Sequence, residues 1–290
     1  MKCINKRFVR VCSLLLVCSL CTISGTGCGE NRLEDAFEAD LPGIGIQTSE
    51  ESSKIPYFAS DLCVTDTDLQ DIEADTEDAL AACFFNLNEK KVLYAKNIHE
   101  RMYPASTTKI MTALVALDKG DLDAQTTVSK EAITFSESGV STAKLKEGDV
   151  LTLRQLLYAL LTVSANDAAN VIAEQIAGSQ DAFVEMMNQE AQKIGATNTH
   201  FVNANGLHSE DHYTTVYDLY LMFNAAMQHE EFLQMLQEKE YQASYQAADG
   251  TTVETVWSTT NQFTKGDVTV PDGVTAVGGK TGTTTAAMSC

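Results

Sequence analysis

The sequence predicts an α+β fold in which an antiparallel sheet is flanked by a cluster of helices. Strand-like segments occur at both ends of the region that starts near Thr76, and helical segments fill the part between them. Elements in this order favour layered packing in which the first and last strands meet in one sheet. The length of 290 residues allows one large domain or two small ones, and the hydrophobic content of 44% is typical of globular proteins.

The first 28 residues are predicted to be an export signal. Four basic residues come first, and the nearly apolar run from Val11 to Ile23 is too short to span a bilayer comfortably. Small residues then lead to Gly27 and Cys28, which resemble the cleavage point of a bacterial lipoprotein signal. We therefore expect an extracytoplasmic protein that is anchored to the outer face of the cytoplasmic membrane if Cys28 is lipidated. Ordinary signal cleavage and secretion to the cell wall is the alternative.

Negative charge is concentrated after this signal. Residues 30–80 hold 15 acidic residues but only two basic ones, Arg32 and Lys54, within a chain whose net charge is −20. We interpret residues 29–75 as an acidic linker. Nucleic-acid binding is not expected, because phosphate recognition requires a basic surface. The spacing of the three later cysteines, Cys63, Cys83 and Cys290, excludes a zinc ribbon.

The pattern of apolar residues then predicts each element in turn. A hairpin is expected from strands at 79–85 and 92–95, which a polar turn separates. A helix is expected from Ser106 to Gly120, because the apolar residues that follow Ser106 recur at helical spacing. Five further helices are expected at 151–163, 166–177, 182–194, 216–227 and 230–236. The last expected strand surrounds Gly278-Gly279-Lys280.

One short motif places an amine beside a hydroxyl. Ser106-Thr107-Thr108-Lys109 is an S-x-x-K at a helix start, where positions three apart share a face. A serine hydroxyl is a weak nucleophile until a base removes its proton. Lysine can be that base only if burial or a second cation lowers its pKa from about 10.4, and Lys280 is the candidate cation. The free amide N–H groups at the helix start could bind an oxyanion.

Two further motifs supply polar groups. Ser164-Ala165-Asn166 is an S-x-N between two predicted helices, and it can supply a hydroxyl to a proton relay and an amide to a substrate backbone. Lys280-Thr281-Gly282 is a K-T-G on a predicted strand, and it offers a cation and a hydroxyl to a substrate carboxylate. Gly282 would let the substrate lie against the strand. Each motif alone is common, but the three together in this order predict one site that needs no metal or cofactor.

The three motifs together resemble those of penicillin-binding proteins and class A β-lactamases. Residues 79–109, 156–170 and 203–222 are also similar to the low-molecular-mass serine D-alanyl-D-alanine carboxypeptidases. The resemblance covers residues 79–290 and implies a β-lactamase/transpeptidase-like fold, with a catalytic domain at 76–290. It implies an enzyme that removes the terminal D-Ala from peptidoglycan stem peptides and that binds β-lactam antibiotics as inhibitors.

This resemblance also implies a role for each motif residue. Ser106 is the nucleophile that forms the acyl-enzyme, and Lys109 is its base. Ser164 and Asn166 shape the proton relay and the substrate cleft.

The residues of the third motif have roles by the same resemblance. Lys280 and Thr281 hold the terminal carboxylate, and the backbone N–H groups of Ser106 and Thr283 form an oxyanion hole. Thr283 stands where the family often has a larger side chain. The family also has further strands and a helix after this motif, so we expect the sequence to be truncated at Cys290 and the chain to be less stable than its parent.

Three other functions fit parts of the sequence. A class A-like β-lactamase would normally have Asp in place of Ala165 and a Glu near 199–206, where none occurs. A zinc peptidase could use His208 and His212, but HSEDH is neither H-E-x-x-H nor H-x-x-E-H. A non-catalytic wall-binding or β-lactam-sensing domain would lack D-alanine release.

Overall fold

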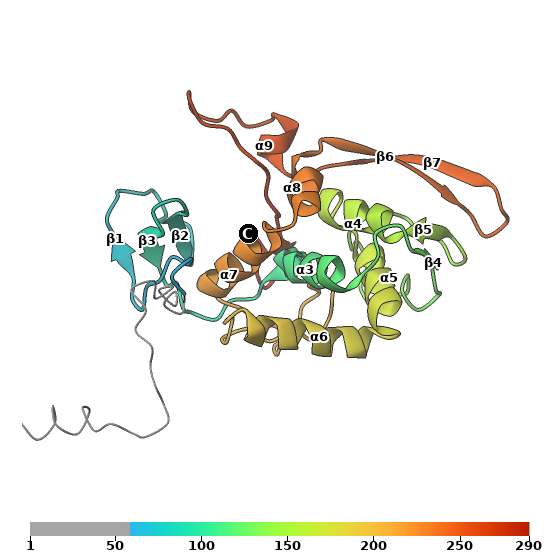
Figure 1. Cartoon of the computed structure of the whole chain (residues 1–290), viewed down its shortest axis with the longest axis horizontal. Coiled ribbons are helices and arrows are strands. Elements are labelled where there is room, and N and C mark those ends of the chain that lie inside the picture. The colour runs from blue at the N-terminus through green and yellow to red at the C-terminus, as the bar shows by residue number, and fades with distance from the viewer. Residues whose placement is uncertain (1–58, 290) are drawn as a thin grey trace, which may run out of the picture. The chain divides into compact units, whose positions relative to one another are not determined.

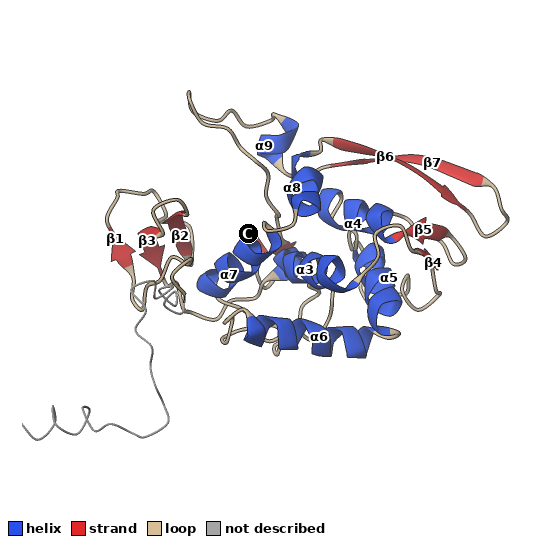
Figure 2. Cartoon of the chain, viewed as in Figure 1, coloured by secondary structure: helices blue, strands red, loops and turns tan. Residues whose placement is uncertain are grey.

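Helices form the centre of the part of the chain that the structure describes, residues 59–289 of a computed structural model, and three small antiparallel sheets accompany them (Figures 1 and 2). The predicted α+β class is confirmed. The signal segment and Cys28 lie outside the described residues. The helices, in chain order, are η1 (Ala105–Thr108), α3 (Lys109–Lys119), α4 (Leu153–Thr162), α5 (Asn166–Ala177), α6 (Gln180–Lys193), α7 (Val216–Ala226), α8 (Glu230–Gln237) and α9 (Gln262–Lys265).

Helix α3 is the core of this arrangement. Every residue from Lys109 to Ala116 is buried, so the helix is enclosed on all sides rather than on one face. It contacts α4, α5, α6 and α7. A central helix of this kind holds its first turn in a fixed place. None of the helices in the described range is long and apolar enough to cross a membrane.

The first sheet contains the predicted hairpin and one strand that was not predicted. Its order is β1 (Leu69–Gln70), β3 (Lys91–Lys96) and β2 (Ala82–Asn86). The interpretation of 29–75 as linker is therefore wrong from residue 59 onward. Cys63 is buried, and its backbone N–H donates to the Tyr220 hydroxyl at 2.8 Å. The end of the acidic segment is thus part of the folded region, because Cys63 is buried and β1 pairs with β3.

The second sheet was not predicted. It has the order β4 (Gln125–Thr127), β5 (Val150–Thr152), β6 (Glu240–Gln246) and β7 (Thr252–Ser258). Strands β6 and β7 form a long hairpin that projects beyond α4 in Figure 1. Tyr158 of α4 stacks on Tyr241 of the hairpin with ring centroids 3.8 Å apart, and Tyr241 stacks in turn on Trp257. These rings fasten the hairpin to the helices.

The end of the described chain differs from the prediction. The third sheet is only the pair β8 (Thr283–Thr284) and β9 (Met288–Ser289), and it does not join the N-terminal sheet. The predicted strand around Gly278-Gly279-Lys280 is absent. The Lys280-Thr281-Gly282 motif is instead unpaired chain just before β8, because no described strand lies beside it to complete a ladder.

Candidate active site

Ser106 lies in the short helix η1, one turn before α3 begins. This agrees with its predicted place at a helix mouth. The preceding residue, Ala105, has a φ of +48°, which non-glycine residues rarely adopt. Such backbone strain costs on the order of 1–3 kcal/mol and persists only where the surroundings impose it.

Two glycines permit close packing of other segments against this turn. A Cβ on Gly206 would lie 2.0 Å from the Ala105 carbonyl oxygen, and the φ of Gly206 is +86°. A Cβ on Gly282 would lie 3.0 Å from the Ser106 backbone nitrogen and 3.1 Å from the Pro104 oxygen. Gly282 was expected to make room for substrate. Its closest neighbours are the backbone atoms of the Ser106 turn, so it also allows the chain before β8 to approach this turn.

The amine of Lys109 is completely buried beside Ser106. It donates to Ser106 Oγ at 3.0 Å and to Asn166 Oδ1 at 2.6 Å, and it also contacts the Asn205 carbonyl oxygen. Burial lowers the pKa of Lys109 well below its ordinary value, and the nearby charge of Lys280 lowers it further. Both causes were anticipated from the sequence. A lowered pKa makes Lys109 a readier proton acceptor than an ordinary lysine.

The amine of Lys280 reaches the other side of the site. It donates to Ser164 Oγ at 2.9 Å, which joins the second and third motifs. Ser164 has a φ of +57°, a second strained backbone position at this site. Burial lowers the pKa of Lys280 to about 8, so this amine is mostly charged at neutral pH. Thr281 Oγ1 lies 3.2 Å from Thr260 Oγ1.

A chain of asparagines was not predicted as part of the site. Asn205 Nδ2 donates to Asn170 Oδ1 at 2.9 Å, and Asn170 Nδ2 donates to the Ala132 carbonyl oxygen at 2.9 Å. Asn203 Oδ1 accepts the Gly206 N–H at 2.7 Å. These bonds hold the Asn205 carbonyl toward Lys109. The sequence did contain a signal for this network, namely three asparagines: Asn203 and Asn205 in one turn, and Asn170 in α5.

Asp167 was also missed. Its carboxylate accepts the backbone N–H groups of Ala143 at 2.9 Å and Leu145 at 3.1 Å. Burial raises the pKa of Asp167, and its backbone hydrogen bonds oppose that rise. The neighbouring Asn166 N–H donates to the Ser141 carbonyl oxygen at 2.8 Å. Helix α5 thus holds the 141–145 segment against the site.

The two histidines of the zinc alternative do not form a metal site. His212 is buried, its Nδ1 accepts the Val202 N–H at 3.2 Å, and its Nε2 lies 2.8 Å from Thr108 Oγ1. Burial lowers the pKa of His212 to about 4, so the ring is neutral and both nitrogens are engaged. His208 instead meets the Tyr103 ring edge-on. The described residues contain no group of three or more His, Cys, Asp and Glu side chains placed to hold a metal.

Ser106 opens into a cavity of about 200 Å³. Asn166 and Asn205 line it together with Ser106, and so do the segments 137–141 and 283–285. The cavity therefore gathers the nucleophile candidate, part of the S-x-N motif and β8. Lys109 lies behind Ser106, and Lys280 reaches Ser164 next to Asn166.

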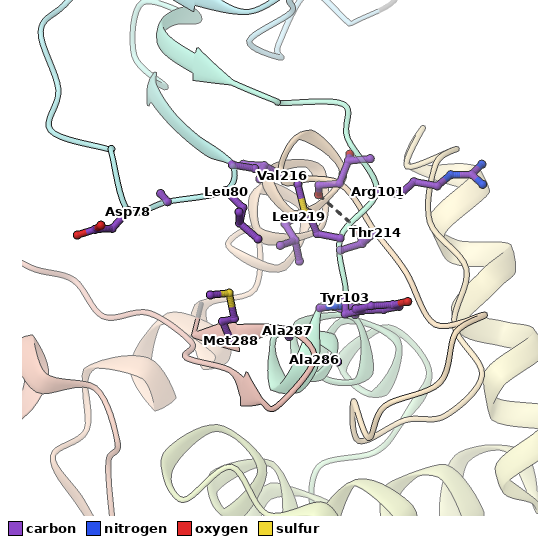
Figure 3. Close-up of a pocket in the computed structure, with 15 residues that line it drawn as sticks. Asp78, Leu80, Arg101, Tyr103, Thr214, Val216, Leu219, Ala286, Ala287 and Met288 are labelled. Carbon is purple, nitrogen blue, oxygen red and sulfur yellow. Dashed lines mark hydrogen bonds between the residues drawn. The ribbon is translucent and has the colours of Figure 1, made fainter.

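A second cavity of about 590 Å³ does not include Ser106. Figure 3 shows Leu80 and Leu219 above Met288, with Tyr103 to the right of them. Its lining is mainly apolar and contains none of the residues of the three motifs. Ser106, Asn166 and Thr283 of the candidate site line the smaller cavity instead.

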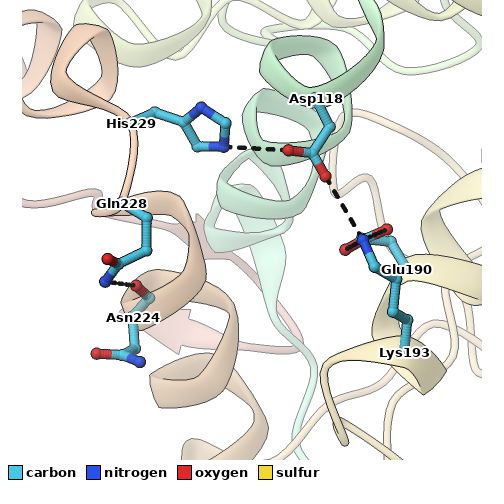
Figure 4. Close-up of polar contacts among 6 residues, drawn as sticks. All are labelled: Asp118, Glu190, Lys193, Asn224, Gln228 and His229. Atoms are coloured by element: carbon cyan, nitrogen blue, oxygen red, sulfur yellow. Dashed lines mark hydrogen bonds and ion pairs between the residues drawn. The ribbon is translucent and has the colours of Figure 1, made fainter. Parts of the chain in front are cut away.

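A separate polar cluster lies near the other end of α3. Asp118 contacts His229 Nε2 at 3.2 Å and Lys193 Nζ at 3.9 Å, and Lys193 also pairs with Glu190 at 2.9 Å (Figure 4). Lys193 is largely exposed, and the Glu190 carboxylate raises its pKa. The cluster joins α3, α6 and the connection before α8. Nine residues of helix, about 14 Å, separate Asp118 from Lys109, so the cluster is a structural tie and not part of the site.

Comparison with known proteins places the chain among cell-wall peptidases. The profile of the peptidase S11 family, described as D-alanyl-D-alanine carboxypeptidase, matches residues 68–290. The chain is 38% identical over 156 residues to D-alanyl-D-alanine carboxypeptidase DacF of Bacillus subtilis, a match that covers 53% of this chain and 40% of DacF. It is 36% identical over 164 residues to DacC of Escherichia coli, which covers 54% of this chain and 41% of DacC. The matches thus span well under two thirds of these relatives.

Solved structures agree on the fold. The DD-transpeptidase of Streptomyces K15 superimposes with a TM-score of 0.69 at 31% identity, covering 75% of this chain and 85% of that one. This likeness confirms the transpeptidase-like fold expected from the three motifs.

Proposed function

Because this chain belongs to the peptidase S11 family of D-alanyl-D-alanine carboxypeptidases, we propose that it removes the terminal D-alanine from peptidoglycan stem peptides through an acyl-enzyme on Ser106. The contact between the buried Lys109 amine and Ser106 Oγ, at 3.0 Å, is the observation that carries the proposal. It supports a serine nucleophile with a neutral amine as its base.

Acylation follows from the arrangement of these groups. Neutral Lys109 takes the Ser106 proton as Oγ attacks the carbonyl carbon of the penultimate D-Ala. The backbone N–H groups of Ser106 and Thr283 stabilise the resulting oxyanion. The C–N bond then breaks, and the leaving amine of D-alanine takes the proton through Lys109 or the Lys280–Ser164 contact. An ester on Ser106 remains.

Deacylation uses the same base. A water molecule gives a proton to Lys109 and attacks the ester carbonyl, and Ser106 leaves with the proton restored. A β-lactam would acylate Ser106 in the same way. Its leaving amine stays tethered after the ring opens, so it would act as an inhibitor. No step needs a metal or cofactor.

The test is D-alanine release from a synthetic peptide that ends in D-Ala-D-Ala, together with acylation by a labelled penicillin. Release and labelling together would support the proposal. Labelling without release would favour the β-lactam-sensing alternative. If the protein shows no labelling and no release, both functions are refuted. Because the Streptomyces K15 relative is named a transpeptidase, an added amine acceptor distinguishes hydrolysis from transfer.

The proposed carboxylate anchor makes a separate prediction. Lys280→Ala should lower kcat/KM for peptides with a free terminal carboxylate by roughly 10- to 100-fold more than for their amidated forms, because a charge-assisted contact is lost. Both substrates should slow somewhat, since the Lys280 charge also lowers the pKa of Lys109. The ratio of the two rates is therefore the measurement. The exposed Lys265→Ala is the matched control, and equal losses on both peptides would contradict the anchoring role.

We propose an extracytoplasmic location and a lipid anchor at Cys28, which the signal pattern of the sequence supports. In a bacterial host, wild-type protein should fractionate with membranes and incorporate labelled fatty acid. Cys28→Ser should lose the label and move to the soluble extracytoplasmic fraction, because the protein would then carry no acyl chains to hold it on the bilayer. Retention of the label in Cys28→Ser would rule out this attachment point.

A further inference from the structure

One charged side chain lies in the cavity that Ser106 opens into. Of the residues that line this cavity, Glu137 is the only ionisable one, and the others are serines, threonines, asparagines, glycines, Val140 and Leu207. Glu137 is exposed and no described residue pairs with it in a salt bridge. The proposed chemistry gives it no role. A lone carboxylate facing a substrate cavity is positioned to recognise a cation.

The segment that carries Glu137 is held in place at its far end. The Ser141 carbonyl oxygen accepts the Asn166 N–H at 2.8 Å, and Asp167 accepts the N–H of Ala143 two residues later. Segment 137–141 therefore forms part of the wall of the cavity and is fixed to helix α5, which begins at Asn166 of the S-x-N motif.

The order of residues along the chain sets which part of the substrate this wall meets. If Lys280 and Thr281 hold the terminal carboxylate and Thr283 faces the scissile carbonyl, then Thr284 and Thr285 continue toward the acyl-donor part of the peptide. Thr284 continues strand β8, in which the chain rises about 3.3 Å per residue, and Thr285 begins the turn that follows. This end of the cavity is therefore where the residue just before D-Ala-D-Ala would lie. Thr284, Thr285 and Glu137 line the same cavity.

We infer that Glu137 selects substrates whose residue before D-Ala-D-Ala carries a side-chain ammonium group. This inference rests on the proposed carboxypeptidase activity and adds the substrate preference of the same site. An acidic wall favours a cationic side chain by Coulomb attraction and disfavours a neutral or anionic one. Because Glu137 is exposed, water and salt screen the attraction, and the preference is modest.

The experiment compares two peptides of equal length that end in D-Ala-D-Ala. One has lysine before this pair, and the other has Nε-acetyl-lysine, which removes the charge and keeps the side chain. Wild-type protein should show a kcat/KM about 2- to 5-fold higher for the lysine peptide, and the ratio should fall toward one in high salt. Glu137→Gln should bring the ratio close to one at low salt. Glu137→Lys should reverse it.

Controls separate this inference from the proposed activity. Glu131→Gln removes an equally exposed carboxylate that does not line the cavity, and it should keep the wild-type ratio. D-alanine release from both peptides at equal rates by wild-type protein would overturn the inference and leave the activity intact. An unchanged ratio in Glu137→Gln would also overturn it. No release from either peptide, with Ser106 not labelled by penicillin, would instead refute the proposed function.

Discussion

Ser106→Ala is expected to abolish penicillin labelling and to reduce D-alanine release by a factor on the order of 10⁶, the loss in kcat that follows removal of the nucleophilic serine from a serine protease. The alanine cannot form the ester, so no alternative covalent route remains. Lys109 would keep two of its three hydrogen-bond partners, Asn166 and the Asn205 carbonyl, so the site should stay folded. Mass spectrometry after β-lactam treatment should place the adduct of the wild-type protein on the peptide that contains Ser106.

A matched control is available in the same region. Ser136 is exposed and does not line the Ser106 cavity, so Ser136→Ala should label normally. Thermal unfolding of Ser106→Ala should resemble that of wild type, which separates loss of chemistry from loss of fold. Undiminished labelling of Ser106→Ala, or an adduct on another peptide, would show that the nucleophile has been assigned wrongly.

Helices were predictable because their signals are local. Each of the five helices expected after residue 150 is present, within two residues of its expected bounds. In α5 the periodic apolar residues end at Gly178, which has a φ of +79° and closes the helix as a C-cap. For α4 the expected start was two residues early, because Thr152 and Gln155 form a capping box that the apolar run of Val150 and Leu151 concealed.

Strands were less predictable because a strand depends on its partner. The β6–β7 hairpin has alternating buried residues and Asp249-Gly250 at its turn, a pattern that indicates a hairpin and that was not used. The opposite error occurred at Gly278-Gly279-Lys280, where a strand was expected and no described strand pairs with it. Leu69–Gln70 forms only two bridges, too short a segment for any sequence pattern to mark.

The motif residues of the site were predictable, but their supports were not. The sequence suggested that Lys109 would approach Ser106 and that Lys280 would lower its pKa, and both occur. Nothing in the spacing showed that Asn205 would turn its carbonyl onto the same amine from a distance of 96 residues. The sequence also did not reveal why residue 206 is a glycine, which is the close approach of the Ala105 carbonyl oxygen.

The second large effect is expected from Lys109→Met. Removing the general base should lower the rate of acylation by about 10²–10⁴ for every substrate and β-lactam, with or without a terminal carboxylate. The pH profile should change as well. In wild type, acylation should rise with pH as Lys109 loses its proton, and fall above about 8 as Lys280 loses the charge that binds carboxylates. Lys109→Met should lack the rising limb that Lys109 causes.

Stability measurements should report the same buried amine independently of catalysis. The pKa of Lys109 is lower in the folded protein than in the unfolded chain, so between these two values the unfolded chain binds more protons. The free energy of unfolding of wild type should therefore rise with pH up to about 10.4, by at most about 1.4 kcal/mol per pH unit from this group. Lys280 adds a rise of the same sign from about 8 upward, and this rise should be present in both proteins. Urea unfolding at several pH values should thus show that the free energy of unfolding of wild type increases relative to that of Lys109→Met as the pH rises. If the difference between the two free energies does not change with pH, Lys109 keeps its proton in the folded state and cannot serve as the base.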